Sequence, residues 1–168
     1  IAGGAVRDVL NKREVKDFDI FVQVPDWEDD PCEASEMIDD VVRAVNELFY
    51  QQGDPKSESL QDLKKEEGYG GYDIYSVWGW SHGFNSMPCD VVFIRDEPIA
   101  HLKQFDFGLC QALVSPSFGL RTTPAYQRDA IDKTITFLLG PEERDRSRAH
   151  LHRFLPKYQG WKVRGISA

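Results

Sequence analysis

Two aspartates one residue apart are the part of this sequence best suited to chemistry. Asp17 and Asp19 alternate with apolar side chains in the segment 16–22, KDFDIFV. Successive side chains of a β-strand point to opposite faces, so the alternation predicts both carboxylates on one face, with Phe18 and Ile20 on the other. Neighbouring carboxylates repel each other unless a cation lies between them, and their oxygens suit a hard divalent ion such as Mg²⁺. The pattern therefore predicts a metal-binding strand.

A diglycine near the start of the chain is the second candidate feature. Gly3 and Gly4 precede a segment that predicts a short helix over residues 4–11. Backbone N–H groups at such a turn can face a phosphate, and glycine lets the backbone approach it closely. A phosphate-binding turn combined with a metal-binding pair indicates chemistry on a nucleoside triphosphate.

The elements that must position these residues follow from capping signals and periodicity. Asp30 can cap a helix, Pro31 suits its first position, and Glu33 follows three residues after the cap. Apolar residues then recur at helical spacing until Gly53. The other expected elements are strands over 17–24, 72–78 and 89–94, loops over 54–70 and 115–124, a turn over 78–85, a helix over 97–105 that can continue to residue 113, mixed signals over 130–139, and a helix over 142–155. This order predicts an α+β fold, a small mixed or antiparallel sheet with helices packed on one side.

Length and composition set the broad class of the protein. With 168 residues, 41% of them hydrophobic, the chain can form one domain, or one domain with a small appendage, around a core. It contains no run of eighteen apolar residues and no recognisable signal peptide, so we expect no membrane span and a cytoplasmic location. The chain begins without methionine where a strand should already be running, and we expect further residues before it.

Charge is distributed unevenly along the chain. The formal net charge of −8 argues against broad adhesion to nucleic acid. Residues 26–67 carry 14 acidic and 4 basic residues, which indicates a solvated surface or a docking surface for a protein partner that the sequence does not identify. Residues 141–164 carry 7 basic and 3 acidic residues, so this segment is either a solvated face or a phosphate-facing helix.

The other chemically capable side chains have simpler interpretations. The three cysteines are far apart and share no zinc-binding spacing with the histidines, which favours reduced, buried thiols. His101, His150 and His152 are interpreted as surface residues without a partner. The aromatic residues within 78–84 could stack on a base, but core packing or a hairpin cap is the simpler interpretation.

Two segments of the chain resemble a known signature. Residues 3–10, GGAVRDVL, followed by Asp17-x-Asp19, are similar to the pattern GGxVRDxL…DxD of the class II tRNA nucleotidyltransferase and poly(A) polymerase family, part of the polymerase-β nucleotidyltransferase superfamily. Residues 89–95, CDVVFIR, resemble the family strand EVxxFR and have Asp90 at its acidic position. The chain also has a loose likeness to compact phage nucleotidyltransferases.

A third match is partial. Residues 104–112, QFDFGLCQA, resemble the family motif RDFTxNA, whose residues help to handle the sugar and triphosphate. Asp106 fits the motif, whereas Phe105, Gly108 and Cys110 stand where the family has arginine, threonine and asparagine. The resemblance therefore implies a nucleotide contact for Asp106 on an eroded motif.

A fourth match lies in the basic segment. The family motif EDxxR reads the incoming base, and here Glu143 and Arg146 occupy its acidic and basic positions on one face of the expected helix. Residues 26–70 look like an acidic helical insertion relative to the family core. The expected organisation is a catalytic domain over 1–140 and a basic C-terminal helix and tail over 141–168.

The resemblance implies a role for each matched residue. Asp17, Asp19 and Asp90 would be the catalytic residues and would bind Mg²⁺, with Mn²⁺ as the alternative ion. Arg7 would either neutralise phosphate or hold Asp8 in place. The residues with an implied nucleotide-binding role are Gly3, Gly4, Arg7, Asp106, Glu143 and Arg146.

The implied activity is transfer of a nucleoside monophosphate from a nucleoside triphosphate to an acceptor hydroxyl. The acceptor would be an RNA 3′ end or another macromolecule, and RNA would contact the basic segment 141–164. Two alternatives remain open: a nucleotide-binding module in which catalysis is lost, and an enzyme that transfers the nucleotide to a protein or small molecule. The fold implied by the resemblance is that of the polymerase-β nucleotidyltransferases.

Overall fold

The computed structural model describes residues 1–24, 31–50, 57–59, 74–80 and 87–166. The chain divides into two compact units. Unit 1 contains residues 1–15 and 102–168, and unit 2 contains residues 16–101. Each unit is described separately.

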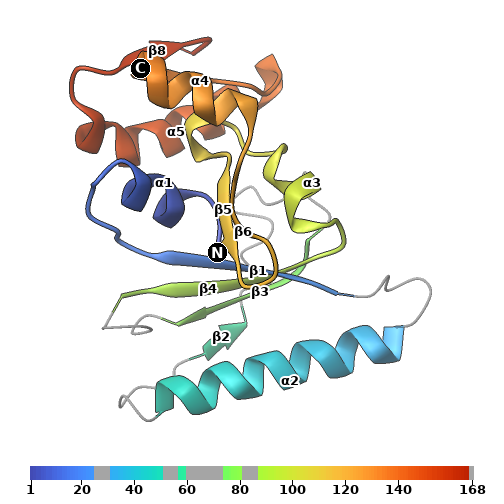
Figure 1. Ribbon diagram of the computed structural model, residues 1–168. Coiled ribbons are helices and arrows are strands. Elements are labelled where there is room, and N and C mark those ends of the chain that lie inside the picture. The colour runs from blue at the N-terminus through green and yellow to red at the C-terminus, as the bar shows by residue number, and fades with distance from the viewer. Residues whose placement is uncertain (25–30, 51–56, 60–73, 81–86, 167–168) are drawn as a thin grey trace. The chain divides into compact units, whose positions relative to one another are not determined.

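Unit 2 is built on a four-stranded mixed sheet with the strand order β1-β4-β3-β2 (Figure 1). The strands are β1 (Phe18–Gln23), β2 (Ser57–Ser59), β3 (Ile74–Trp80) and β4 (Cys89–Ile94). Strand β1 runs parallel to β4, whereas β3 pairs antiparallel with both β4 and β2. Strands β3 and β4 are the antiparallel pair that the sequence predicts.

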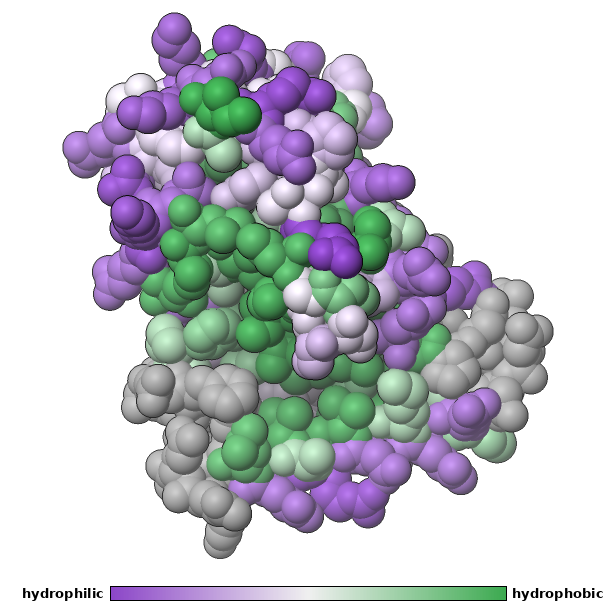
Figure 2. Space-filling view, viewed as in Figure 1, coloured by the Kyte–Doolittle hydropathy of each residue, from purple (hydrophilic) through white to green (hydrophobic). Residues whose placement is uncertain are grey.

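Helix α2 (Pro31–Tyr50) covers one face of this sheet (Figure 1). Its buried residues Ala34, Ile38 and Val42 recur at helical spacing, and hydrophilic side chains line its outer side (Figure 2). The core between helix and sheet contains Val24, Ile38, Val42, Trp80, Cys89, Val91 and Phe93. Trp78 packs against the same core, and the Trp80 indole N–H donates to Asn46 over 2.8 Å. Both tryptophans therefore serve core packing, as the simpler interpretation expected.

The opposite face of the sheet has its own smaller apolar cluster. Val77, Val92 and Ile94 are buried there, and Phe21 and Ile74 pack against them. This face also receives Asp19 and Asp90, because side chains alternate along each strand. The short helix α3 (Pro98–Leu102) follows β4, and the ring of its buried His101 lies 5.1 Å from the ring of Phe21.

Unit 1 contains the remaining elements, which are mostly short. Its helices are α1 (Gly4–Leu10), α4 (Pro124–Asp132) and α5 (Arg144–Phe154), with 3₁₀ turns at Gly108–Cys110, Pro141–Glu143 and Leu155–Tyr158. Its strands form an antiparallel hairpin of β5 (Ala112–Ser115) and β6 (Gly119–Thr122) and a parallel pair of β7 (Thr134–Thr136) and β8 (Lys162–Arg164).

The core of unit 1 brings together both ends of the chain. Helix α5 has a charged sequence, but its Ser147, Leu151 and Phe154 are buried at spacings of four and three. Leu151 and Phe154 pack with Val6 of α1 and with Phe107. The basic helix is thus an integral part of the core of unit 1, with its arginines on the outer side.

Helix α4 is fixed to the sheet pair by one carboxylate. The Thr123 hydroxyl caps the helix by accepting from the Tyr126 N–H over 3.2 Å. At the other end, Asp129 accepts from the Thr134 hydroxyl over 2.8 Å and from the Thr136 N–H over 2.9 Å. These bonds hold α4 against β7.

The α+β class predicted from the sequence is confirmed, and several boundaries differ. The helix expected over 97–105 ends at residue 102, and its continuation to 113 is wrong, because Phe107 instead bridges Phe137 and residues 112–115 form β5. The loop expected over 115–124 is wrong as well, since Gly119, with φ of 65°, turns the chain into β6. The loop expected over 54–70 and the turn expected over 78–85 are wrong where the structure describes them, since residues 57–59 form β2 and residues 78–80 belong to β3. The Asp30 cap and the rest of both segments lie outside the described residues.

Among the described residues, no helix combines the length and apolar character needed to cross a membrane.

Candidate active site

Asp19 and Asp90 lie opposite each other on neighbouring strands of unit 2. In the parallel pair β1 and β4, Asp19 is the register partner of Asp90. Register partners in adjacent strands point to the same face, and adjacent strands are about 4.8 Å apart. Both side chains are half-buried on the face opposite α2. Two residues 71 positions apart in the chain are therefore brought together as the resemblance implied.

The acid pair has a residue without a side chain as its neighbour on one strand. The register partner of Asp90 on β3 is Gly79, so the row across three strands reads aspartate, aspartate, glycine. The next row along the same face holds Phe21, Val92 and Val77 in register. A strand glycine commonly marks a place where a ligand approaches the backbone closely.

Asp17 lies one residue before the first residue of β1 and is exposed. The Phe18 N–H donates to the Pro88 carbonyl over 3.0 Å, so the pairing of the two strands extends to this end. Strand alternation places the Asp17 side chain on the side of Asp19. A contribution of Asp17 to the same metal site stays a prediction.

The buried thiol next to the pair responds to its negative charge. Burial, reinforced by the negative charges of Asp90 and Asp19, raises the pKa of Cys89 to about 12. The negative charges of Asp19 and Asp90 attract a cation. Their carboxylate oxygens suit Mg²⁺, which prefers hard oxygen ligands. The residues present therefore suit the ion that the sequence predicts.

The diglycine lies in unit 1 and has an unusual backbone. Gly3 has φ of 70° and ψ of −127°, a region that L side chains rarely adopt. Its N–H donates to the Ala112 carbonyl over 3.0 Å, and its carbonyl accepts from the Arg7 N–H over 2.9 Å. Gly3 thus joins α1 to β5, and its proximity to the aspartates of unit 2 stays a prediction.

Replacing Gly3 by alanine is expected to lower the free energy of unfolding by about 1–3 kcal/mol, because a Cβ is strained in this conformation. Gly4→Ala is the matched control, since a Cβ there would meet its nearest atom, a terminal nitrogen of Arg7, at 3.6 Å, and α1 accepts alanine. Urea denaturation of both variants measures the difference. Equal effects of the two substitutions would contradict the argument.

Arg7 and Asp8 form the centre of a buried charge network in unit 1. The Arg7 Nε donates to the Asp8 carboxylate over 2.7 Å, and both side chains are buried. The same carboxylate accepts from Lys157 Nζ over 2.5 Å and from the Tyr158 hydroxyl over 2.9 Å. The resemblance left two roles open for Arg7: to neutralise phosphate or to hold Asp8 in place. The structure contains the contact between Arg7 and Asp8.

This network keeps Asp8 ionised. Burial alone would raise the pKa of Asp8, but the hydrogen bonds and positive charge of Arg7, together with the bonds from Lys157 and Tyr158, lower it below its usual value. The Arg7 guanidinium also lies 4.2 Å above the centre of the Phe154 ring. The C-terminal segment is therefore tied to α1 by both charge and packing.

Asp106 faces a histidine in the structure. The Asp106 carboxylate lies 2.8 Å from Nδ1 of His150, and Asp106 is buried. The interpretation of His150 and His101 as surface residues without a partner is wrong, because His150 pairs with Asp106 and His101 is buried against Phe21. His152 is exposed, as expected. The nucleotide contact of Asp106 stays a prediction.

Glu143 and Arg146 form an ion pair at the start of α5. The guanidinium of Arg146 lies 3.5 Å from the Glu143 carboxylate, and about a third of each side chain is exposed. The two residues therefore share one helix face, as their spacing predicts. Recognition of the base of the incoming nucleotide by these two residues stays a prediction.

The cysteines follow the expectation in two of three cases. Cys89 and Cys110 are buried free thiols, whereas Cys32 is exposed on α2. The described part of the chain contains no disulfide among them.

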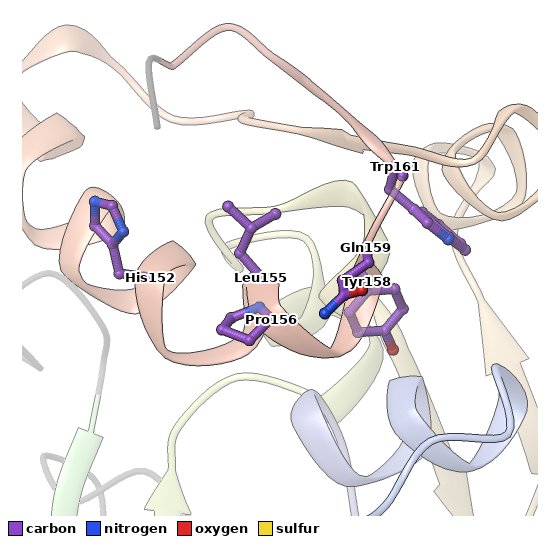
Figure 3. Close-up of a pocket in the computed structure, with 7 residues that line it drawn as sticks. His152, Leu155, Pro156, Tyr158, Gln159 and Trp161 are labelled. Carbon is purple, nitrogen blue, oxygen red and sulfur yellow. The ribbon is translucent and has the colours of Figure 1, made fainter.

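The described residues of unit 1 form at least two cavities. The larger, about 400 Å³, surrounds the 3₁₀ turn after α5 and is lined by His152, Leu155, Pro156, Tyr158, Gln159, Gly160 and Trp161 (Figure 3). The Tyr158 hydroxyl points away from it toward α1 (Figure 3), consistent with its bond to Asp8. The smaller, about 290 Å³, is lined by Arg144, Arg148, Gly165 and Ile166. As formed by the described residues, neither cavity includes the aspartates at 17, 19 and 90.

Sequence reasoning missed the partners of the Arg7–Asp8 pair on α1. Lys157 reaches Asp8 from 149 positions away, and Tyr158 joins the same carboxylate. No local periodicity connects such distant residues, and the excess of basic residues near the C-terminus was the only signal available.

No protein-family model matches the sequence, and no curated protein matches it. Solved structures do match. A tRNA-processing enzyme in an apo form has a TM-score of 0.59 and 20% identity over 97% of this chain and 40% of that one. A CCA-adding enzyme in complex with ATP has a TM-score of 0.57 and 19% identity over 97% of this chain and 34% of that one.

A third structure, a tRNA-processing enzyme with CTP, has a TM-score of 0.51 and 20% identity over 97% of this chain and 39% of that one. The chain therefore spans about two fifths of the length of these proteins or less. At such identity the likeness establishes the fold, and this α+β chain has the fold of a corresponding part of CCA-adding and tRNA-processing enzymes.

Proposed function

We propose that this chain is a metal-dependent nucleotidyltransferase that moves a nucleoside monophosphate from a nucleoside triphosphate to an acceptor hydroxyl. The observation that supports this most is the register of Asp19 and Asp90 on one face of the sheet. The fold shared with CCA-adding and tRNA-processing enzymes, among them structures with ATP or with CTP bound, supports the same activity.

Asp17, Asp19 and Asp90 hold the Mg²⁺ in this proposal. Bound there, the ion would neutralise triphosphate charge and lower the pKa of the attacking hydroxyl. The protein's own contribution is the rigid spacing of the carboxylates, since Asp19 and Asp90 lie on adjacent hydrogen-bonded strands rather than on loops. Gly79, the register partner of Asp90 on β3, places no side chain beside this carboxylate.

The remaining matched residues have nucleotide contacts in this proposal. The turn at Gly3 and Gly4 approaches the triphosphate without the Gly3 N–H, which already donates to the Ala112 carbonyl, and Asp106, Glu143 and Arg146 contribute to nucleotide recognition. Arg7 acts through Asp8, because its guanidinium is buried against that carboxylate and the Phe154 ring. Arg7 is therefore a positioning residue for α1 rather than a direct phosphate ligand.

The acceptor proposed for this activity is an RNA 3′ end. Helix α5 turns its arginines outward, and Arg144 and Arg148 line a cavity of about 290 Å³ with polar character. Such a basic surface suits a phosphodiester backbone and offsets, locally, the net negative charge of the chain. A salt-dependent affinity for RNA is the expected consequence.

A second candidate function is a nucleotide-binding module without turnover. The observation that favours it is the packing of the eroded motif. A Cβ at Gly108 would lie 2.7 Å from the Asp129 carboxylate, and Cys110 is buried. The threonine and asparagine of the family motif therefore have no equivalent place here. The retained acidic residues at positions 17, 19 and 90 favour the enzyme.

Incubation with Mg²⁺, each of four labelled nucleoside triphosphates and short RNA acceptors tests the proposal. We expect pyrophosphate release and an RNA product longer by at least one nucleotide, with loss of both on addition of EDTA. Nucleotide binding without turnover on RNA, protein or small-molecule acceptors would support the binding module and contradict the enzyme. Label on protein rather than RNA would reassign the acceptor.

A further inference from the structure

We propose that Asp106, Cys110 and His150 form a binding site for Zn²⁺ in unit 1, separate from the acid pair of unit 2. One ligand atom from each of the three side chains lies within 4.8 Å of the other two. This Asp–Cys–His cluster does not depend on nucleotide transfer, and zinc bound there would take as a ligand the Asp106 carboxylate that the proposed function assigns to nucleotide recognition.

The three residues come from elements that the fold holds in place. Cys110 ends a buried 3₁₀ turn, and the Asp106 carbonyl accepts from the Leu138 N–H over 2.8 Å. His150 lies on α5, whose neighbouring Phe154 belongs to the core. Two of the three residues are buried and His150 is half-buried. The cluster is thus prepared by the fold of unit 1 and is not a set of solvated surface groups.

The separations are close to those of a tetrahedral site. With Zn–S near 2.3 Å and Zn–N or Zn–O near 2.1 Å, ligand atoms around zinc are about 3.4–3.6 Å apart. The Asp106–His150 contact of 2.8 Å would open slightly on binding, and the Sγ of Cys110, within 4.8 Å of both partners, would adjust to its distance from zinc. Rotation of short side chains is sufficient for shifts of this size.

The types of ligand select the metal. A thiolate and an imidazole favour a borderline ion such as Zn²⁺ over Mg²⁺, which prefers oxygen ligands alone. Three protein ligands leave a fourth position for water. The charges of one thiolate and one carboxylate balance the two positive charges of the ion.

Arg7 is the positive group nearest to this cluster, and its geometry is compatible with zinc. Its terminal nitrogen donates to the Cys110 sulfur over 3.3 Å. Burial raises the pKa of this thiol to about 11 although the positive charge of Arg7 lowers it, so zinc would displace the thiol proton on binding. Its own charge is balanced by Asp8 through the 2.7 Å ion pair. Arg7 would therefore act as a hydrogen-bond donor to the metal-bound sulfur, which is a common supporting contact.

The imidazole of His150 is also held by its neighbours. Its ring centre lies 5.2 Å from the ring of Phe154 and 5.7 Å from the ring of Phe107. This apolar surround limits competing water and fixes the orientation of the ring. Zinc bound here would connect α5 to the segment 106–110 and stabilise unit 1.

Titration of the metal-free protein with Co²⁺, a spectroscopic substitute for Zn²⁺, tests this proposal. We expect one thiolate-bound ion per chain, with absorption from a cobalt–thiolate bond, visible bands typical of tetrahedral cobalt, and displacement of this ion by one equivalent of Zn²⁺. Cys110→Ser and His150→Gln should each weaken binding by about 100-fold or more, since loss of a supporting partner alone costs about 10–100-fold. Cys32→Ser and His152→Gln, at exposed positions, are the matched controls and should leave the titration unchanged.

A wild-type titration without the thiolate absorption, or an unchanged spectrum in folded Cys110→Ser, would overturn the proposal. X-ray absorption at the zinc edge of the wild-type protein serves if the Cys110 variant fails to fold. There we expect one sulfur neighbour at about 2.3 Å together with nitrogen or oxygen neighbours. A shell of oxygen and nitrogen alone would exclude Cys110 as a ligand.

Discussion

Replacing Asp19 or Asp90 by asparagine is expected to reduce nucleotidyl transfer by at least about 10³-fold, which corresponds to about 4 kcal/mol of transition-state stabilisation. Each substitution removes one negative charge from the acid pair that the β1–β4 register creates. Asparagine keeps the size of the side chain, so the sheet should remain folded. Single-turnover assays at saturating nucleoside triphosphate and Mg²⁺ measure the loss.

Asp39→Asn provides the control for this experiment. Asp39 is an exposed carboxylate on α2, in the same unit. Its substitution changes the net charge by the same amount. It should retain the wild-type rate. If Asp19→Asn and Asp90→Asn also retain it, the acid pair has no catalytic role and the activity lies elsewhere.

Asp8→Asn is expected to lower the free energy of unfolding by about 3–5 kcal/mol. The substitution leaves Arg7 and Lys157 without the carboxylate that both contact, and removing one partner of a buried ion pair has a cost of this size. Urea denaturation at pH 7 measures it. Asp145→Asn, which removes a carboxylate that is 96% exposed, should change stability by less than about 1 kcal/mol.

The pH dependence gives an independent check of this network. The pKa of Asp8 is lower in the folded protein than in the unfolded chain, where it is about 3.9. Its contribution is therefore present above that value and is lost as the pH falls through the folded pKa. The difference in stability between wild type and Asp8→Asn should shrink below about pH 4. A difference that stays constant down to pH 2 would show that Asp8 acts through packing alone.

The elements that the sequence predicted well are those with local signals. Helix α2 follows from an apolar stripe at helical spacing, and β1 from alternation around Asp19. The faces of β1 and β4 could be assigned because a period of two leaves no alternative within each strand. The pairing of Asp19 with Asp90 needed the resemblance, since alternation within a strand does not identify its neighbour.

The elements that were missed depend on distant contacts. Residues 112–115 had an apolar sequence compatible with a continuing helix, but Ala2 bridges Leu113 and fixes that segment as β5. Strand β8 is three residues long and exists because it pairs with β7. Such short segments have too little periodicity to be distinguished from loops by pattern alone.

The candidate site could be predicted from the sequence only where it depends on local type and spacing. The acidic residues were identified by type and spacing, whereas the 2.8 Å contact between Asp106 and His150 joins residues 44 positions apart. His150 lies on a charged helix whose outer face is solvated, and only the packing of Leu151 and Phe154 shows which way the helix turns. A single sequence contains no signal for that orientation beyond two apolar residues.

Diffraction from crystals soaked in MnCl₂ and a non-hydrolysable nucleoside triphosphate tests the central claim most directly. Anomalous scattering locates manganese, which takes the oxygen ligands of magnesium. The acid pair predicts a manganese peak between the carboxylates of Asp19 and Asp90, within about 2.3 Å of an oxygen from each. Manganese bound to the nucleotide with neither carboxylate as a ligand would contradict the proposed function.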